Sequence, residues 1–137
     1  MSRRKARDIS FKCIYQLEYD TLNDIDKLIG YNLDDENVLD DDLEYIKSVV
    51  TGVKDNLPEL DKNIECNLKE WTIERISKVD LAILRLAIYE ILYIPELSNK
   101  VSANEAVELA KTYCDDNSPK FINGVLASVI SKVTSSN

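Results

Sequence analysis

Residues 77–95 have the sequence SKVDLAILRLAIYEILYIP, in which apolar side chains cover almost every direction of the helix that the spacing predicts. Only Asp80, Arg85 and Glu90 interrupt this apolar surface. A helix that is apolar all round belongs in the middle of a protein, so we expect the other elements to pack around it. Ser77 and Asp80 resemble a capping pair at its start. We expect Arg85 and Glu90 to be paired within the core, because charged groups are seldom buried without a partner.

The rest of the chain also predicts helices, since its apolar residues recur at helical spacing and it holds only three glycines and three prolines. Ser102 with Glu105 predicts a capping box for the helix after the central one, and Ser118 before Pro119 predicts the start of the last helix. Besides the central helix, we expect helices over about residues 3–18, 22–30, 43–57, 58–68, 102–114 and 119–133.

The predicted fold class is all-α, with about seven helices in two packed helical bundles. We expect a single domain over residues 1–137, with an N-terminal bundle of about residues 1–56 and a C-terminal bundle of about residues 57–137. Between the second and third helices we expect an acidic connector, YNLDDENVLDDD at residues 31–42, which contains the run DDENVLDDD. This run lacks the central glycine and the final glutamate of a calcium loop, so it predicts a solvated loop that supplies helix caps.

The composition argues against several classes of function. The chain has no histidine, which is the commonest general base and metal ligand, and its scattered glycines cannot form a phosphate-binding loop. We therefore expect no enzymatic activity, no metal and no cofactor. No apolar run is long enough to cross a bilayer, and the basic start lacks the features of a signal peptide, so we expect a cytoplasmic protein. The three widely spaced cysteines, Cys13, Cys66 and Cys114, are expected to be reduced and structural.

Charge is unevenly distributed along this acidic chain, whose formal net charge is -8. Its first seven residues nevertheless include Arg3, Arg4, Lys5 and Arg7. These cations lie at the positive end of the predicted helix dipole, and Arg3 and Arg7 form a like-charge pair one turn apart. Each effect costs on the order of tenths of a kcal/mol. Because local stability does not explain these residues, we interpret them as a binding site for nucleic-acid phosphate.

Placed at about 100° per residue, Arg4, Arg7, Phe11 and Tyr15 share one arc of the first helix, apart from the apolar arc that faces the core. Guanidinium groups interleaved with aromatic rings suit single-stranded nucleic acid, because the cations follow phosphates while the rings stack on bases. The alternative is that the arginines only solvate the end of the helix and that the rings pack against a neighbouring bundle. For Phe11 and Tyr15 the sequence leaves both interpretations open.

Three segments of the chain, in order, resemble the signature stretches of the NusB family of transcription antitermination factors. They are RRKARDISFKCIYQLE at residues 3–18, ISKVDLAILRLAIYEI at residues 76–91, and VSANEAVELAKTYCDDNSPKFINGVL at residues 101–126. The third segment is the most specific, because a capping box, an AVELAK helix, an acidic turn and KFINGVL would rarely coincide. The resemblance covers essentially the whole chain.

This resemblance implies an all-helical protein without enzymatic activity. Members of the family bind the boxA element of ribosomal RNA leader transcripts, as a heterodimer with the ribosomal small-subunit protein NusE. They help RNA polymerase to read through terminators, and they assist ribosomal RNA maturation. The partners that the resemblance implies are therefore single-stranded boxA RNA, NusE and the RNA polymerase antitermination complex.

The resemblance also implies roles for individual residues by position. The residues that match the family's RNA-binding arm, its helix-one tyrosine, and the lysine and phenylalanine near the RNA are Arg3, Arg4, Lys5, Arg7, Tyr15, Lys120 and Phe121. Asp80 falls where the family carries an acidic residue that we associate with the NusE-facing side. From spacing alone, Phe121 is as compatible with core packing as with base contact.

Two positions depart from the family pattern. Asn117 stands where some relatives carry an aspartate, and the loss of that negative charge should favour nearby RNA phosphate. Cys114 stands where a glycine often follows the AVELAK helix, which bears on the backbone of the turn and leaves the expected fold unchanged.

Two other functions are compatible with parts of the sequence. One is a helical protein-interaction module without RNA binding, in which the arginines contact an acidic partner. The other is the NusB-like domain of a ribosomal RNA methyltransferase, which would need a catalytic domain that these 137 residues do not contain. RNA binding that depends on salt separates the first of these from an RNA-binding factor.

Overall fold

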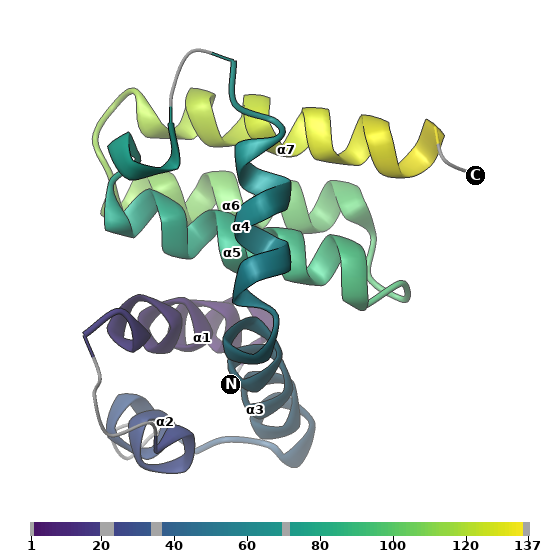
Figure 1. Ribbon diagram of the computed structural model, residues 1–137. Helices are drawn as coiled ribbons and strands as arrows, with labels where there is room; N and C mark the ends of the chain where they lie inside the picture. Colours follow the sequence, from purple (N-terminus) through teal and green to yellow (C-terminus); the bar gives the residue numbers. More distant parts are fainter. Residues whose placement is uncertain (1, 20–23, 34–36, 70–71, 136–137) are drawn as a thin grey trace. The chain divides into compact units, whose positions relative to one another are not determined.

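The computed structural model describes residues 2–19, 24–33, 37–69 and 72–135, and within these ranges the chain is helical and has no strand (Figure 1). The predicted all-α class is confirmed. In chain order the elements are α1 (Arg3–Leu17), α2 (Ile25–Leu33), α3 (Asp40–Asp55), α4 (Leu57–Glu65), the 3₁₀ helix η1 (Ile73–Arg75), α5 (Lys78–Tyr93), α6 (Asn99–Tyr113) and α7 (Ser118–Ser135). Among the described helices, none combines the length and the apolar character needed to cross a bilayer.

The observed boundaries differ most from the predicted ones at α2. This helix continues to Leu33, so residues 31–33, which we expected in the acidic connector, are helical. The predicted start of this helix near residue 22 lies outside the described residues. Pro58 lies in the first turn of α4, as predicted, because proline lacks only an N–H that would have no partner inside the helix at that position.

The contacts divide the chain into two compact units, residues 1–55 and residues 56–137. In the first unit, α1 packs against both α2 and α3. In the second unit, α5 packs against α4, α6 and α7. Within its own unit, α5 is therefore the central helix that the apolar stretch predicted.

Two charged residues in the middle of α5, Arg85 and Glu90, are buried and bonded to neighbouring helices. Arg85 is 7% exposed, and its Nε and Nη2 atoms donate to the two carboxylate oxygens of Asp61 on α4, each at 2.8 Å. Glu90 is 1% exposed, and its Oε1 atom accepts a hydrogen bond from the Ser102 hydroxyl on α6 at 2.9 Å. Both residues therefore have partners within the core, and each of these contacts fixes α5 against a different helix.

The predicted capping box at Ser102 is wrong, whereas the predicted cap at Ser77 is confirmed. The Asp80 N–H donates to Ser77 Oγ at 3.1 Å at the start of α5. By contrast, α6 begins at Asn99 and is capped by Ser98, whose Oγ accepts from the Val101 N–H at 3.4 Å. The Ser102 hydroxyl lies inside the unit because the buried Glu90 carboxylate requires a donor there.

In the first unit, α1 buries the apolar arc that the spacing predicted. Its buried apolar side chains include Ala6, Ile9, Cys13 and Ile14, and α3 contributes Ile46, Val49, Val50 and Val53 to the same core. A polar contact adds to this packing, since Asn32 Nδ2 on α2 donates to Gln16 Oε1 on α1 at 2.8 Å. These contacts fix the position of α1 within the first unit.

We expect Asp61→Asn to destabilise the second unit, because it removes the carboxylate that faces the Arg85 guanidinium. The side chain of Arg85 is 9% exposed and that of Asp61 is 30% exposed, so water offsets only part of the loss. The free energy of unfolding in urea should fall by about 2 kcal/mol. Glu65→Gln, which neutralises an exposed carboxylate on the same helix, is the matched control and should cost less than about 0.5 kcal/mol. Equal stability of the two variants would contradict the role of this pair.

Candidate nucleic-acid interface

The amino-terminal end of α1 carries the cluster of basic residues that stands out in the sequence. Ser2 caps this helix, since the Lys5 N–H donates to Ser2 Oγ at 3.1 Å. The helix begins at Arg3, and its first turn contains no acidic residue. Cations at this end interact unfavourably with the helix dipole, so the destabilisation expected from the sequence applies to the observed helix.

Three of these cations reach the surface, and we call Arg3, Arg4 and Lys5 the α1 basic face. Arg3 and Arg4 are exposed and Lys5 is half-buried. Lys5 Nζ lies 3.9 Å from Asp8 Oδ2, and Lys12 Nζ lies 3.1 Å from the same oxygen. Exposed ion pairs of this kind contribute little to stability, so the lysines can exchange them for phosphate at little cost.

Arg7 and Phe11 do not lie on the surface, which corrects the expectation that Arg7 contacts a ligand directly. Arg7 is 5% exposed and Phe11 is 4% exposed. The reason is that α3 packs against α1, and the Cζ atom of Arg7 lies 5.9 Å from the ring centroid of Tyr45 on α3. For Phe11, the alternative interpretation of core packing therefore describes the structure.

Arg3 is also held by α3, although it stays partly in solvent. Its Nε atom lies 3.5 Å from Asp42 Oδ1, and its Cζ atom lies 4.3 Å from the ring centroid of Tyr45. The second distance is within the range of about 6 Å for cation–π attraction. The Arg3 side chain remains 41% exposed. The sequence-based prediction gave no role to Tyr45, because nothing in the sequence places this ring beside α1.

Tyr15 lies at the other end of α1 and pairs with Tyr19. The two rings meet edge to face, with centroids 5.5 Å apart. Tyr15 is half-buried, whereas Tyr19 is 63% exposed. The sequence-based prediction did not include Tyr19, although its spacing of four residues from Tyr15 was a signal that could have found it. The pair offers an exposed aromatic surface of the kind on which bases stack.

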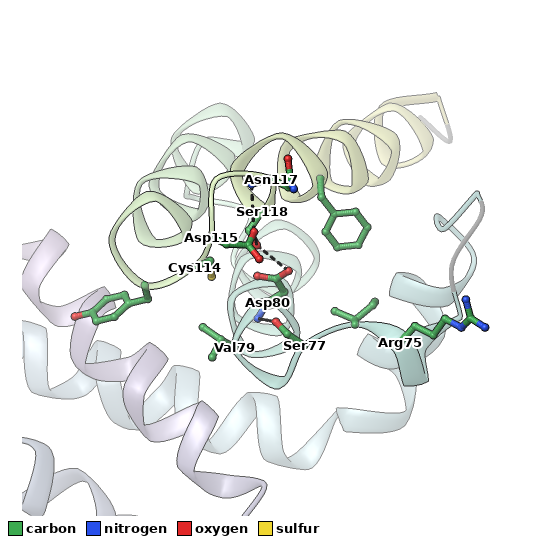
Figure 2. A pocket seen from close by; sticks show the side chains of 11 residues that line it. Arg75, Ser77, Val79, Asp80, Cys114, Asp115, Asn117 and Ser118 are labelled. Carbon is green, nitrogen blue, oxygen red and sulfur yellow. Dashed lines mark hydrogen bonds between the residues drawn. The ribbon is translucent and has the colours of Figure 1, made fainter.

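The other predicted RNA-binding residues lie where α6 turns into α7, in the second unit. Asn117 and Lys120 are exposed and Phe121 is half-buried. The Asn117 N–H donates to Asp115 Oδ1 at 3.2 Å, just before α7 begins at Ser118. Figure 2 shows Asn117 beside the start of this helix.

A cavity of about 600 Å³ adjoins this turn (Figure 2). Its walls come from the 3₁₀ helix η1, the start of α5, the turn after α6 and the start of α7. The lining residues include Arg75, Asp80, Cys114, Asn117 and Phe121. In the part of the chain that the structure describes, no group of three or more cysteine, aspartate or glutamate side chains could hold a metal ion.

Asp80 lies in the wall of this cavity and is only 8% exposed. Its Oδ2 atom accepts a hydrogen bond from Ser118 Oγ at 3.1 Å, which ties the start of α5 to the start of α7. Among the described residues, its Oδ1 atom has no hydrogen-bond partner. The role toward a protein partner that the resemblance implied for Asp80 stays a prediction. The carboxylate holds two helix starts together inside the second unit.

The thiol of Cys114 is beside this carboxylate. Burial, followed by a hydrogen bond to Asp80 and the charge of that carboxylate, raises the pKa of Cys114 to about 12. Burial likewise raises the pKa of Cys13 to about 12. Both residues are therefore protonated thiols at neutral pH, and all three cysteines are free of disulfides.

The chain is similar to known proteins in both sequence and structure. The model of the NusB family matches residues 4–131. The transcription antitermination protein NusB of Clostridium novyi is 42% identical over 132 residues, which cover 95% of this chain and 98% of that protein. The structure of T. maritima NusB has a TM-score of 0.88 and 34% identity, and it covers 96% of this chain and 92% of its own. A crystal structure of antitermination factors NusB and NusE in complex with dsRNA has a TM-score of 0.83 and 27% identity, with 95% and 96% covered.

We expect alkylation to distinguish the three cysteines, because only a thiolate reacts. Cys66 is exposed, whereas Cys13 is buried and Cys114 is half-buried. Iodoacetamide at pH 8 should label Cys66 first in the folded protein, and the other two thiols at least about tenfold more slowly. Labelling of Cys114 should accelerate as the pH rises toward its pKa of about 12. Peptide mass spectrometry measures the rates, and the denatured protein, in which all three should react, is the control. Equal rates at Cys66 and Cys114 in the folded protein would contradict the raised pKa.

Proposed function

The chain belongs to the NusB family, and on that premise we propose that it is an RNA-binding transcription antitermination factor. In this proposal it binds a boxA-type sequence in ribosomal RNA leader transcripts together with NusE, and so supports read-through by RNA polymerase and ribosomal RNA synthesis. The observation that carries the proposal is the α1 basic face, which concentrates cations at the helix end where the dipole disfavours them.

The α1 basic face suits the backbone of RNA. Arg3 and Arg4 are exposed and Lys5 is half-buried, within the first turn of one helix. Each cation that neutralises a phosphate releases counterions, so binding through this face should weaken steeply as salt is added. Such contacts give affinity without sequence preference.

The aromatic residues support a single strand as the preferred form of RNA. The similar structure that contains NusB and NusE holds double-stranded RNA, and phosphate contacts alone do not separate the two forms. The rings of Tyr15 and Tyr19 stack on bases only where the bases are unpaired. We therefore propose that the rings select unpaired RNA and that the cations hold its backbone.

The start of α7 supplies a second set of contacts in this proposal. Lys120 is exposed and suits a phosphate, while Phe121 is half-buried at the cavity and suits a base. The amino end of α7 adds the positive pole of a helix dipole. Asn117 leaves this region with one negative charge fewer than an aspartate would.

The overall charge of the chain gives a reason for a protein partner. With a net charge of -8, the protein as a whole repels RNA at long range, and its basic face is small. We propose that NusE enlarges the contact surface and supplies further positive charge. Affinity for RNA should therefore be modest for this protein alone and higher for the complex.

Charge reversal at Arg4 or Lys120 should weaken RNA binding. Fluorescence anisotropy with a short boxA-like RNA and NusE should show a Kd at least about tenfold higher for Arg4→Glu and for Lys120→Glu. For each variant, the slope of log Kd against log salt should fall by about 0.7, the value for one lost contact to a single strand. The melting temperature should change little, because both side chains are exposed.

Lys27→Glu on α2 is the matched control for Arg4→Glu in the first unit, and Lys62→Glu on α4 is the control for Lys120→Glu in the second unit, since both lysines are exposed. They should bind RNA as the unsubstituted protein does. Equal losses of RNA affinity in the controls would show that net charge alone, and not the position of Arg4 or Lys120, causes the effect. If the unsubstituted protein binds neither single-stranded nor duplex RNA, even with NusE present, the proposal fails and a protein-interaction module is favoured.

Asn117→Asp should weaken RNA binding by about two- to fivefold, because it adds a negative charge beside the proposed phosphate contact of Lys120. The effect should shrink as salt is added, since the interaction is between exposed groups. Asn104→Asp, an exposed substitution of the same kind on α6, is the control and should leave binding unchanged. Binding by Asn117→Asp equal to that of the control at low salt would contradict the contribution of Asn117.

A further inference from the structure

We propose that Tyr45 of α3 positions Arg3 of α1 for contact with RNA phosphate, an inference that rests on the proposed function. Tyr45 is 7% exposed, so its ring is fixed within the first unit. It lies on α3, whose buried apolar side chains form part of the core of the first unit. Its role would be to hold the charge of another helix in place, without touching the RNA.

One ring serves two guanidinium groups. The Cζ atoms of Arg3 and Arg7 lie 4.3 Å and 5.9 Å from the centroid of the Tyr45 ring. The two arginines are four residues apart and therefore lie on the same side of α1. Like charges at this spacing repel each other, and the electron-rich face of a ring offsets part of that repulsion. Tyr45 thus makes an otherwise unfavourable pair of cations compatible with folding.

The ring holds Arg3 without cancelling its charge. A close carboxylate pair, such as that of Arg85 with Asp61 at 2.8 Å, largely neutralises a guanidinium. The pair of Arg3 with Asp42 is longer, at 3.5 Å, and offsets part of the charge of the guanidinium, while the ring lies against the guanidinium without adding negative charge. Because the neutral ring attracts the cation without opposing its charge, the 41% of the Arg3 side chain that is exposed can still attract a phosphate.

Arg7 has a different place in this arrangement. At 5% exposure it cannot contact a polynucleotide strand directly, yet its charge lies one turn from Arg3 on the same helix face. Arg3, by contrast, is already ordered by the ring before RNA arrives, so it loses less side-chain freedom on binding, which favours affinity.

The competing explanation is that Tyr45 is only a core aromatic. Tyr45→Phe keeps the ring and Tyr45→Leu removes it, while both keep the position apolar. Leu also fits a core, so a purely structural role predicts that RNA affinity follows stability. A positioning role predicts that RNA affinity follows the presence of a ring.

The test measures RNA binding with NusE over a range of salt for Tyr45→Phe, Tyr45→Leu and the control Tyr31→Leu, whose ring on α2 is 80% exposed. Tyr45→Phe and Tyr31→Leu should bind within about twofold of the unsubstituted protein. Tyr45→Leu should bind about five- to tenfold more weakly, and the slope of log Kd against log salt should fall by up to about 0.7. In an Arg3→Gln background, Tyr45→Leu should cost much less, because the two residues act together.

Equal losses from Tyr45→Leu in the two backgrounds would overturn the inference, and so would a loss in Tyr45→Phe as large as in Tyr45→Leu. If the unsubstituted protein binds RNA and Tyr45→Leu binds equally well, the inference fails while the proposed function stands. If the unsubstituted protein does not bind, both fail.

A second measurement applies even if Tyr45→Leu does not fold. In the unsubstituted protein, NMR should show the side-chain protons of Arg3 shifted upfield by the ring current of Tyr45, and the shift should persist when RNA is added. Absence of this shift in the free protein, or its loss on addition of RNA, would also overturn the inference.

Discussion

Burial of α5 is the constraint on which the second unit depends. This helix is apolar on nearly all sides, and each of its three buried charged residues must find a partner away from water. Arg85 bonds to Asp61 on α4, Glu90 to Ser102 on α6, and Asp80 to Ser118 at the start of α7. Apolar packing alone would tolerate sliding or rotation of these helices. Three directional contacts to three different helices favour one arrangement, and they set where α7 begins and hence where Asn117, Lys120 and Phe121 lie.

The first unit meets the opposite problem, because its charge is concentrated at a helix end that disfavours it. The chain does not relieve this cost with acidic residues in the first turn of α1. It relieves the cost from a neighbouring helix, through the ring of Tyr45 and the longer contact of Arg3 with Asp42. Stability and function are separated in this way. α3 makes the cations tolerable, and in our proposal the exposed parts of Arg3 and Arg4 contact RNA.

The parts of the fold that could be predicted depend on sequence patterns within a single helix. The apolar stretch around α5, the serine cap at Ser77 and the proline at the start of α4 each depend on residues a few positions apart. Prediction failed at Ser102, where a sequence typical of a capping box serves a carboxylate twelve residues away. It also failed at Arg7, since the arc of a helix shows which residues lie together but not which neighbour covers them.

The sequence by itself determined that the chain is helical, that one helix is central to its bundle, and that positive charge gathers at the start of the first helix. Periodicity and composition carry this information, because they act along one element at a time. Only the tertiary structure decided which cations remain in solvent. Arg3 and Arg4 stay exposed while Arg7 is buried, and Asp80 becomes a link between two helix starts. The physical reason is that exposure is a property of two packed surfaces, and the second surface comes from residues distant in the chain.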